Sequence, residues 1–415
     1  PTALTGELSF GPALDGHLEP SWLGEKIPYK YYGDKLKDYF KTGFSQFHTV
    51  ALGNTTEKSH FRVSVGFNGN NGLFKDETLD KLTTDLNAGA VINDRLSLDG
   101  KISLSHMKAE NRPYTGLNGE VAQLLLIPGN VRLGDLASNY TSAERLHQNW
   151  FGPDQQYSNP YYVRHRFRNS DERWRVFGYY SANLNLTDWL KFNAKYSFDY
   201  YRTRIQTSDL GLGDQAISTP EQSWRDMLTN DNMQRGEENH FEHNIQFLFM
   251  GDTPLTPKLR LGYTVGSNIM YLNYEMLNVG VENMLDKDNW IFNTGYRLVS
   301  GDNDGHKRAM YSVFGSAQIA YDEYLSLDIT ARNDWSSTLP AKNNSFFYPS
   351  ASVSYVFSDF MRSIGKPLPK WVTFTKLRLS AAQVGKDPSP YSLYNTRKFK
   401  FDMGTRKPVV NTIMM

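Results

Sequence analysis

The sequence predicts an all-β protein, an antiparallel transmembrane β-barrel whose wall is built from long amphipathic strands. Three observations point to this fold. About twelve segments alternate between apolar and polar residues. The connections between these segments are alternately short and long, and aromatic residues gather near the segment ends. Because successive side chains of a strand point to opposite faces, each segment requires one apolar and one polar environment.

The alternation is most complete in the segment WLKFNAKYSFDY, from Trp189 to Tyr200. One face carries leucine, phenylalanine, alanine and tyrosine, and the other carries lysine, asparagine, serine and aspartate. A lipid-facing wall with a polar interior accommodates both sets. The same pattern recurs, in chain order, in residues 61–68, 96–105, 173–186, 325–332, 347–357 and 376–382.

Two features of these segments predict the height and the regularity of the barrel wall. Residues 173–186 and 189–207 exceed the roughly 9 to 11 residues that a strand needs to cross a bilayer, so we expect them to project beyond it. Pro349 lies on the apolar face of residues 347–357 and removes one ladder donor. We therefore expect a bulge or a strand start at Pro349.

The aromatic content supports a membrane barrel but does not require one. Aromatic residues make up 14% of the chain, and several tyrosines stand near predicted strand ends, including Tyr161, Tyr162, Tyr200, Tyr201 and Tyr355. Amphipathic rings favour the interface between lipid and water. Any all-β protein is rich in tyrosine and phenylalanine, however, so this composition alone also fits a soluble protein.

Charge and cysteine content exclude other classes. The chain has 45 Lys and Arg and 44 Asp and Glu, so no net basic field attracts nucleic acid, and we expect none as a partner. The basic stretch 161–175 stands among acids and is expected to be a solvated loop rim. No apolar run reaches the roughly 18 to 20 residues of a transmembrane helix, and residues 121–128 predict a packed helical turn inside a loop. The absence of cysteine excludes disulfides and thiolate sites.

The connections sort into two kinds. Short links follow Gly53 and occupy residues 93–95, 187–188 and 322–323. The intervening links are long, at residues 69–80, 111–170, 208–238, 275–306 and 334–344. In an up-and-down barrel, this order places short periplasmic turns at one rim and long extracellular loops at the other.

No sequence pattern predicts catalysis or metal binding. Residues 300–306, SGDNDGH, have a spacing similar to a calcium loop, but Tyr311 replaces the glutamate that would close it. We expect an acidic turn in an extracellular loop. The carboxylates Asp99, Asp199 and Asp328 would suit an acid/base pair, although solvated lumen positions explain them better. The chain is expected to be no enzyme and to need no cofactor or metal.

The long loops supply the candidate residues for contact with a substrate or partner. A tryptophan in a polar loop can stack on a sugar ring or anchor another protein, whereas a large loop also folds around its own aromatics. As a group, the loop tryptophans and one arginine are the candidates: Trp150, Trp224, Trp290, Trp335 and Arg332.

Several blocks of the sequence resemble the SusC/RagA family of TonB-dependent outer-membrane transporters. They occur in the expected order over most of residues 10–391, and several blocks in register are more specific than any one. The blocks are FGPALDG (10–16), DYFKTGFSQFHTVALGN (38–54), FRVSVGFNGNNGLFKD (61–76), YLSLDITARNDWSSTLP (324–340), FFYPSASVSYVFSD (346–359) and KLRLSAAQVGKDPSPY (376–391).

The resemblance implies a barrel of about 22 strands in the bacterial outer membrane, plugged by an N-terminal domain. It implies a SusD-like surface lipoprotein as partner, energy from the TonB complex, and import of oligosaccharides or peptides. An unclosed barrel would expose strand edges to lipid. We therefore expect this chain to be a segment of a longer transporter, without the plug. Residues 1–44 are expected to form an extracellular loop region after the first barrel strand, residues 45–391 strands and loops, and residues 392–415 a further strand or loop.

Two alternatives remain open at this point. A passive porin or an outer-membrane adhesin would use the same kind of wall, with loops that fold inward or bind a surface. A soluble all-β glycan-binding protein would bury the apolar faces in a protein core instead. Substrate identity is not specified by any pattern in the chain.

Overall fold

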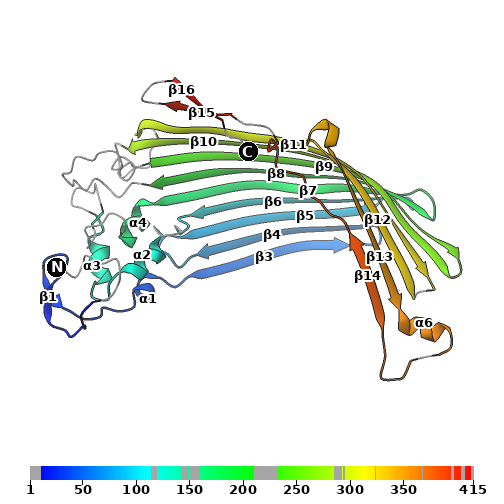
Figure 1. Ribbon diagram of the computed structural model, residues 1–415, viewed down its shortest axis with the longest axis horizontal. Helices are drawn as coiled ribbons and strands as arrows, with labels where there is room; N and C mark the ends of the chain where they lie inside the picture. The colour runs from blue at the N-terminus through cyan, green and yellow to red at the C-terminus, as the bar shows by residue number, and fades with distance from the viewer. Residues whose placement is uncertain are drawn as a thin grey trace.

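An open, curved antiparallel sheet of 12 strands dominates the computed structural model (Figure 1). The structure describes residues 11–113, 119–141, 148–149, 159–209, 232–284, 292, 295–322, 324–366, 368–393, 397–402 and 407–412. Each strand of the sheet pairs with its neighbours in the chain, in the order β14 to β3, and the outermost strands β3 and β14 do not pair with each other. The predicted up-and-down wall of about twelve strands is confirmed.

The strands differ greatly in length. β9, β10 and β11 have 25, 26 and 27 residues, whereas β12 and β13 have 12 each and β14 has 7. The wall is therefore much taller in its middle than beside β14. The bounds are β3 Phe44–Thr55, β4 Ser59–Asn71, β5 Thr78–Val91, β6 Leu96–Glu110, β7 Arg168–Asn185, β8 Leu190–Asp209, β9 Asn232–Thr256, β10 Leu259–Met284, β11 Gly295–Tyr321, β12 Leu325–Ser336, β13 Ser345–Val356 and β14 Lys376–Ala382.

Short turns join the strands at one end of the sheet, except between β13 and β14, where residues 357–375 form a longer connection. We call this end the turn end; the opposite end is the loop end. Four of these turns use a side-chain oxygen that accepts hydrogen bonds from backbone N–H groups two or three residues later. Such local bonds favour a turn over a longer strand. The four residues are Thr56, Asn93, Thr187 and Thr256.

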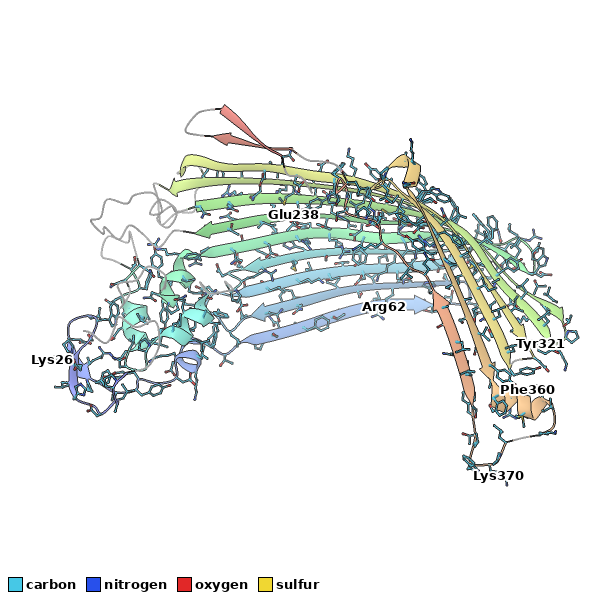
Figure 2. All side chains as sticks on the ribbon, in the orientation of Figure 1. Lys26, Arg62, Glu238, Tyr321, Phe360 and Lys370 are labelled. Atoms are coloured by element: carbon cyan, nitrogen blue, oxygen red, sulfur yellow. The ribbon has the colours of Figure 1, made fainter. Side chains whose placement is uncertain are left out.

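Aromatic side chains gather at the turn end. The ring of Tyr324 lies 5.8 Å from that of Tyr321, 6.2 Å from that of Tyr355 and 5.3 Å from that of Phe360, between ring centroids. Figure 2 shows Tyr321 and Phe360 at this end, far from Glu238, which lies in the half of the sheet toward the loop end. Phe360 belongs to the helix α6, Phe357–Ser363, in the connection between β13 and β14. In the described residues, no helix is long and apolar enough to span a membrane.

The prediction of a long loop at residues 275–306 is wrong. β10 continues to Met284 and β11 begins at Gly295, with Asp302 opposite Asn278 and Asp304 opposite Met276. The proposed acidic turn at residues 300–306 is therefore part of a strand. Ladder hydrogen bonds need no apolar face, so a search for apolar alternation misses a strand whose two faces are both polar.

Pro349 does not form a bulge or a strand start. It lies within β13, opposite Ala331 in an unbroken register with β12. Its carbonyl accepts a 3.0 Å hydrogen bond from the Gln383 N–H. In an antiparallel sheet, the N and C=O of one residue point toward the same neighbouring strand. The N–H that Pro349 lacks would therefore have faced β14, and the ladder with β14 already ends next to it, at Ser350 and Ala382.

Four short helices form a loop body at the loop end. They are α1 (Lys35–Tyr39), α2 (Glu120–Leu126), α3 (Leu133–Ser138) and α4 (Pro160–Arg166). They surround an apolar cluster, and α2 confirms the helical turn predicted within residues 121–128. The cluster consists of Leu124, Ile127, Val131, Leu133 and Leu136, with Trp22, Leu36, Tyr39 and Tyr161 packed against it.

The basic stretch 161–175 is not a solvated rim. Its first part is α4, where Arg164 and Arg166 are buried, and its remainder belongs to β7. Tyr161 and Tyr162 accordingly lie on a helix rather than at a strand end. The Arg164 guanidinium donates to the carbonyls of Lys75 and Asn111, so α4 is tied to the connection after β4 and to the end of β6.

Two small two-stranded sheets and one helical turn complete the described structure. β1 (Leu18–Pro20) pairs with β2 (Lys26–Pro28) near the loop body, and β15 (Arg397–Asp402) pairs with β16 (Lys407–Thr412). A 3-10 turn, Ala341–Asn343, lies between β12 and β13.

Candidate functional site

The register of the large sheet divides its side chains into a polar and an apolar face. Lys195 of β8 lies opposite Ser181 and Gln246, whereas its neighbour Ala194 lies opposite Phe247. Cross-strand partners share a face, so each face is continuous over many strands. Chemistry that recognises a polar molecule is confined to the polar face.

Four rings follow one another across the polar face, one from each of β8 to β11. We call them the ring row: Tyr201, His240, Tyr274 and His306. Each is paired in register with the next. The Tyr201 and His240 rings stack at 4.6 Å with 7° between their planes, and the Tyr274 and His306 rings lie 5.0 Å apart at 31°.

Charged groups border the ring row on the β7 side. The Arg173 guanidinium lies 4.7 Å over the Tyr201 ring and donates to the Thr203 hydroxyl at 2.8 Å. The Arg175 Nε donates to the Asp199 carboxylate at 2.8 Å. These contacts fix the orientation of the guanidinium groups and of Tyr201 before any ligand arrives.

The ring row offers flat apolar faces together with imidazole nitrogens that donate or accept hydrogen bonds. All four rings are partly exposed. Aromatic faces pack against sugar rings and against peptide groups or side chains, and this packing tolerates variation in the ligand. The arrangement can hold a polar molecule that moves past the wall.

Only two of the five predicted contact residues fall within the described residues. Trp150, Trp224 and Trp290 lie outside them. Trp335 belongs to β12 rather than to a loop, and Arg332 lies in the same strand, as its alternating segment predicted. Because three positions separate them in a strand, they point to opposite faces and do not serve one site together.

Arg332 is on the polar face and Trp335 is on the apolar face. The Arg332 Nε donates to Asp334 at 2.7 Å, one of its Nη atoms donates to the Ser312 hydroxyl at 2.8 Å, and its guanidinium lies 5.4 Å over the Phe314 ring. Trp335 is 38% exposed, near the loop end of an apolar row. That position suits an interfacial aromatic rather than a contact inside the wall.

The carboxylates considered for acid/base chemistry are not brought together. Asp199 is held by Arg175, Asp99 accepts a 3.4 Å hydrogen bond from Asn183, and Asp328 accepts one of 3.3 Å from Ser326. Within the described residues, no group of three or more His, Asp or Glu side chains is placed to hold a metal ion.

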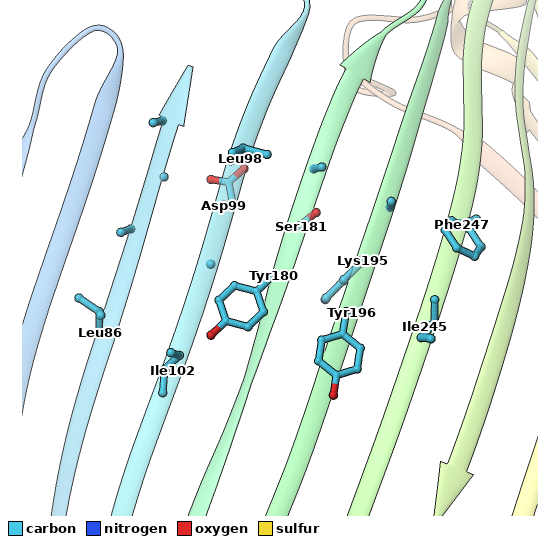
Figure 3. Close-up of a pocket in the computed structure, with 16 residues that line it drawn as sticks. Leu86, Leu98, Asp99, Ile102, Tyr180, Ser181, Lys195, Tyr196, Ile245 and Phe247 are labelled. Atoms are coloured by element: carbon cyan, nitrogen blue, oxygen red, sulfur yellow. The ribbon is translucent and has the colours of Figure 1, made fainter. Parts of the chain in front are cut away.

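A hollow of about 640 Å³ lies on the apolar face and is not part of this site (Figure 3). Small residues open it: Ala88, Gly100, Ala182 and Ala194 stand where larger side chains would fill the surface. Tyr180 and Tyr196, opposite each other on β7 and β8, form part of its wall. Its lining suits hydrocarbon rather than a polar substrate.

Sequence reasoning missed the ring row for an identifiable reason. The sequence places Tyr201 next to Tyr200, and the pair was predicted as one aromatic rim. Period-two alternation instead sends them to opposite faces. The two histidines appear scattered, because their proximity depends on the pairing of Tyr274 with both His240 and His306.

Comparison with known proteins supports the barrel assignment. The family described as "TonB dependent receptor-like, beta-barrel" matches residues 115–412. The structure of the RagAB peptide transporter superposes with a TM-score of 0.71 at 16% identity, over 93% of this chain and 42% of that chain. The structure of the RagAB peptide importer in its "open-open" state superposes with a TM-score of 0.70 at 16% identity, over 91% of this chain and 40% of that chain. A search of curated proteins gives no match.

The sequence identity to these structures is low, so the likeness concerns the fold. The chain spans about two fifths of the length of the RagAB chains that it matches. The family match covers more than half of the chain and confirms the predicted resemblance to TonB-dependent transporters. This chain belongs to the TonB dependent receptor-like, beta-barrel family of outer-membrane proteins.

Proposed function

We propose that the chain forms part of the wall of an outer-membrane transporter that actively imports peptides or oligosaccharides. The polar face would line the lumen, and the apolar face would contact lipid. The observation that carries the proposal is the ring row, two ring pairs that stand next to each other in register across four strands of the polar face. The RagAB relatives of similar fold are described as a peptide importer and transporter, which supports import as the activity.

The proposal includes two partners. A SusD-like surface lipoprotein would deliver substrate at the loop end, and the TonB complex would supply energy through a part of the transporter outside this chain. The family is of the transporter and receptor type. We therefore propose that the ring row binds the substrate during its gated passage and catalyses no chemical step.

Uptake by the complete transporter tests the role of the ring row. We expect Tyr201→Ala to raise the half-saturating substrate concentration by roughly fivefold, equivalent to about 1 kcal/mol of lost ring packing. The matched control is Tyr200→Ala, which removes the adjacent ring from the apolar face and should change uptake less than about twofold. Labelled peptides and oligosaccharides of graded size would be supplied to whole cells, with transporter abundance measured in parallel.

Equal effects of the two tyrosine substitutions would overturn the assignment of the ring row to the lumen. Collapsing the proton-motive force with an uncoupler separates active import from a passive porin. Uptake that persists unchanged with the uncoupler would reject the active mechanism. Uptake of one substrate class alone would identify the cargo.

A further inference from the structure

The wall changes character after its last strand. β14 pairs with β13 only from Lys376 opposite Val356 to Ala382 opposite Ser350, so the loop-end part of β13 has no partner on that side in the described residues. After Gln383 donates to Pro349, the chain leaves the ladder. We call the segment that follows, residues 383–393, the strap.

The strap turns across the polar face instead of continuing the wall. Gly385 lies against Tyr348, since a Cβ built on this glycine would be 3.1 Å from the Tyr348 ring. Tyr348 is opposite Arg332 on the polar face. Two residues later, Asp387 reaches Arg308 of β11 and Ser336 of β12. The strap thus passes over β13 and β12 to β11.

Asp387 is the anchor of the strap. One carboxylate oxygen accepts a hydrogen bond from the Arg308 guanidinium at 2.8 Å. The other accepts from the hydroxyls of Ser336 at 2.6 Å and Thr338 at 3.0 Å. The Asp387 side chain is only 9% exposed and that of Arg308 is 27% exposed. Three bonds to an ionised acceptor hold the segment firmly.

The anchor stands beside the ring row. Arg308 is two residues from His306, on the same face of β11, and it lies just beyond the end of β12, where Met310 pairs with Ser336. The strap therefore occupies space on the lumen side of the wall, next to the surface proposed to contact substrate. A segment in this place limits the width of the passage.

We infer that the strap is a constriction of the lumen, held closed by Asp387, and that it sets the size of substrate that passes the ring row. Asp387 acts as a positioning residue, through Arg308, Ser336 and Thr338. This inference rests on the proposed transport function. It extends that function to regulation, because any event that breaks the Asp387 bonds widens the same passage.

A reversible disulfide, which we call the staple, tests the inference in the complete transporter. This chain contains no cysteine, so Thr338→Cys with Asp387→Cys introduces one thiol pair into its 415 residues, at positions whose side-chain oxygens are 3.0 Å apart; any cysteine elsewhere in the transporter is replaced by serine. Oxidised, the pair replaces the anchor with a disulfide; reduced, it releases the strap. We expect the reduced form to take up the longest substrates of a graded series at least fivefold faster than the oxidised form. Short substrates should enter at equal rates.

A second measurement does not depend on transport. His240→Cys places a thiol in the ring row, and maleimides of graded size added outside the cell report access to it. Asp387→Ala should speed labelling by the largest reagent at least threefold and leave the smallest unchanged, while Asp387→Glu should keep the slow rate. The parent protein without an added cysteine gives the background.

The outcomes separate the two proposals. Identical size dependence in the oxidised and reduced staple, together with unchanged labelling in Asp387→Ala, would overturn the strap as a constriction. Changed labelling without any energy-dependent uptake of peptides or oligosaccharides would support the strap and reject the proposed transport function.

Discussion

The loop body and the strap are two insertions on the same wall, and each contains one half or both halves of an arginine–carboxylate pair. The Arg164–Glu120 pair joins two helices within the loop body, whereas the Arg308–Asp387 pair joins the strap to β11. In the loop body, Arg164 and Glu120 are 3.4 Å apart, with side chains only 5% and 2% exposed. In the strap pair, Arg308 and Asp387 are 2.8 Å apart, and their side chains are 27% and 9% exposed. The more deeply buried pair therefore has the longer distance between its nitrogen and oxygen atoms.

Hydrogen bonding shows which of the two carboxylates is better satisfied. Asp387 accepts from Ser336 and Thr338 as well as from its arginine. One oxygen of Glu120 is buried without a hydrogen-bond partner. Burial raises the pKa of the Glu120 carboxyl to about 7, against an opposing effect of Arg164.

The comparison shows that burial alone does not make an ion pair a strong link. A buried charge costs free energy unless its remaining oxygens are bonded. The Glu120 pair is thus suited to specifying how the helices pack, and it responds to pH. The Asp387 anchor holds a segment through several bonds that must break together.

The largest effect is expected when Arg164 is removed. At pH 8, Arg164→Met removes both the cation that lowers the pKa of the buried Glu120 and the donor to the Lys75 and Asn111 carbonyls. Together these losses should cost about 3 to 5 kcal/mol of local stability in the loop body. Hydrogen exchange at the Gln123 amide, which is bonded to the Gly119 carbonyl within α2, would report the loss.

The double variant Glu120→Leu/Arg164→Met serves as the control, because it removes both charges. It should be more stable than Arg164→Met by the cost of the uncompensated Glu120 carboxyl, about 1 kcal/mol or more, although the bonds to the Lys75 and Asn111 carbonyls stay lost. A double variant as unstable as Arg164→Met would mean that lost packing and lost hydrogen bonds, not an uncompensated charge, explain the first result.

A smaller effect is expected from pH. The folded pKa of Glu120, about 7, exceeds its ordinary value of 4.5, so its protonated form is favoured by folding. The resulting stabilisation, about 3 kcal/mol, should be fully present below pH 4.5 and lost as the pH rises through 7. Glu120→Gln should abolish this dependence in the exchange of the α2 amides. A native loop body that gains stability from pH 5 to 7.5 would contradict the assignment.

The smallest effect is expected at the strap. Asp387→Asn keeps an acceptor for the hydroxyls but loses the charge on the bond to Arg308, which should cost about 1 to 2 kcal/mol. Hydrogen exchange in residues 383–393 should quicken, while exchange in the loop body stays unchanged. Equal changes in both regions would show that the two insertions are coupled rather than independently anchored.

The strands of the wall were predictable because their alternation is a local property. The segment from Trp189 to Tyr200 contains its own two faces, and the structure places it in β8, Leu190–Asp209. Prediction failed in the loop-end part of β11, at residues 300–307, where neither face is apolar. There, backbone pairing with a neighbour, rather than lipid, maintains the strand.

The candidate site was harder to predict. Tryptophans in long connections were chosen by residue type, but three lie outside the described residues and Trp335 faces away from the lumen side. Tyr201, His240, Tyr274 and His306 are far apart in the chain and meet only through register. Asp387 lacked any local signal, because its three partners belong to other segments.

The sequence by itself determined an amphipathic antiparallel wall with turns at one end and loops at the other. These features follow from the period of two and from turn residues that act within a few positions. Only the tertiary structure decided how tall each strand is, which rings share a row, and that the chain after β14 crosses the polar face. Those outcomes depend on pairing between distant segments, and a shift of one residue in register would reverse every face.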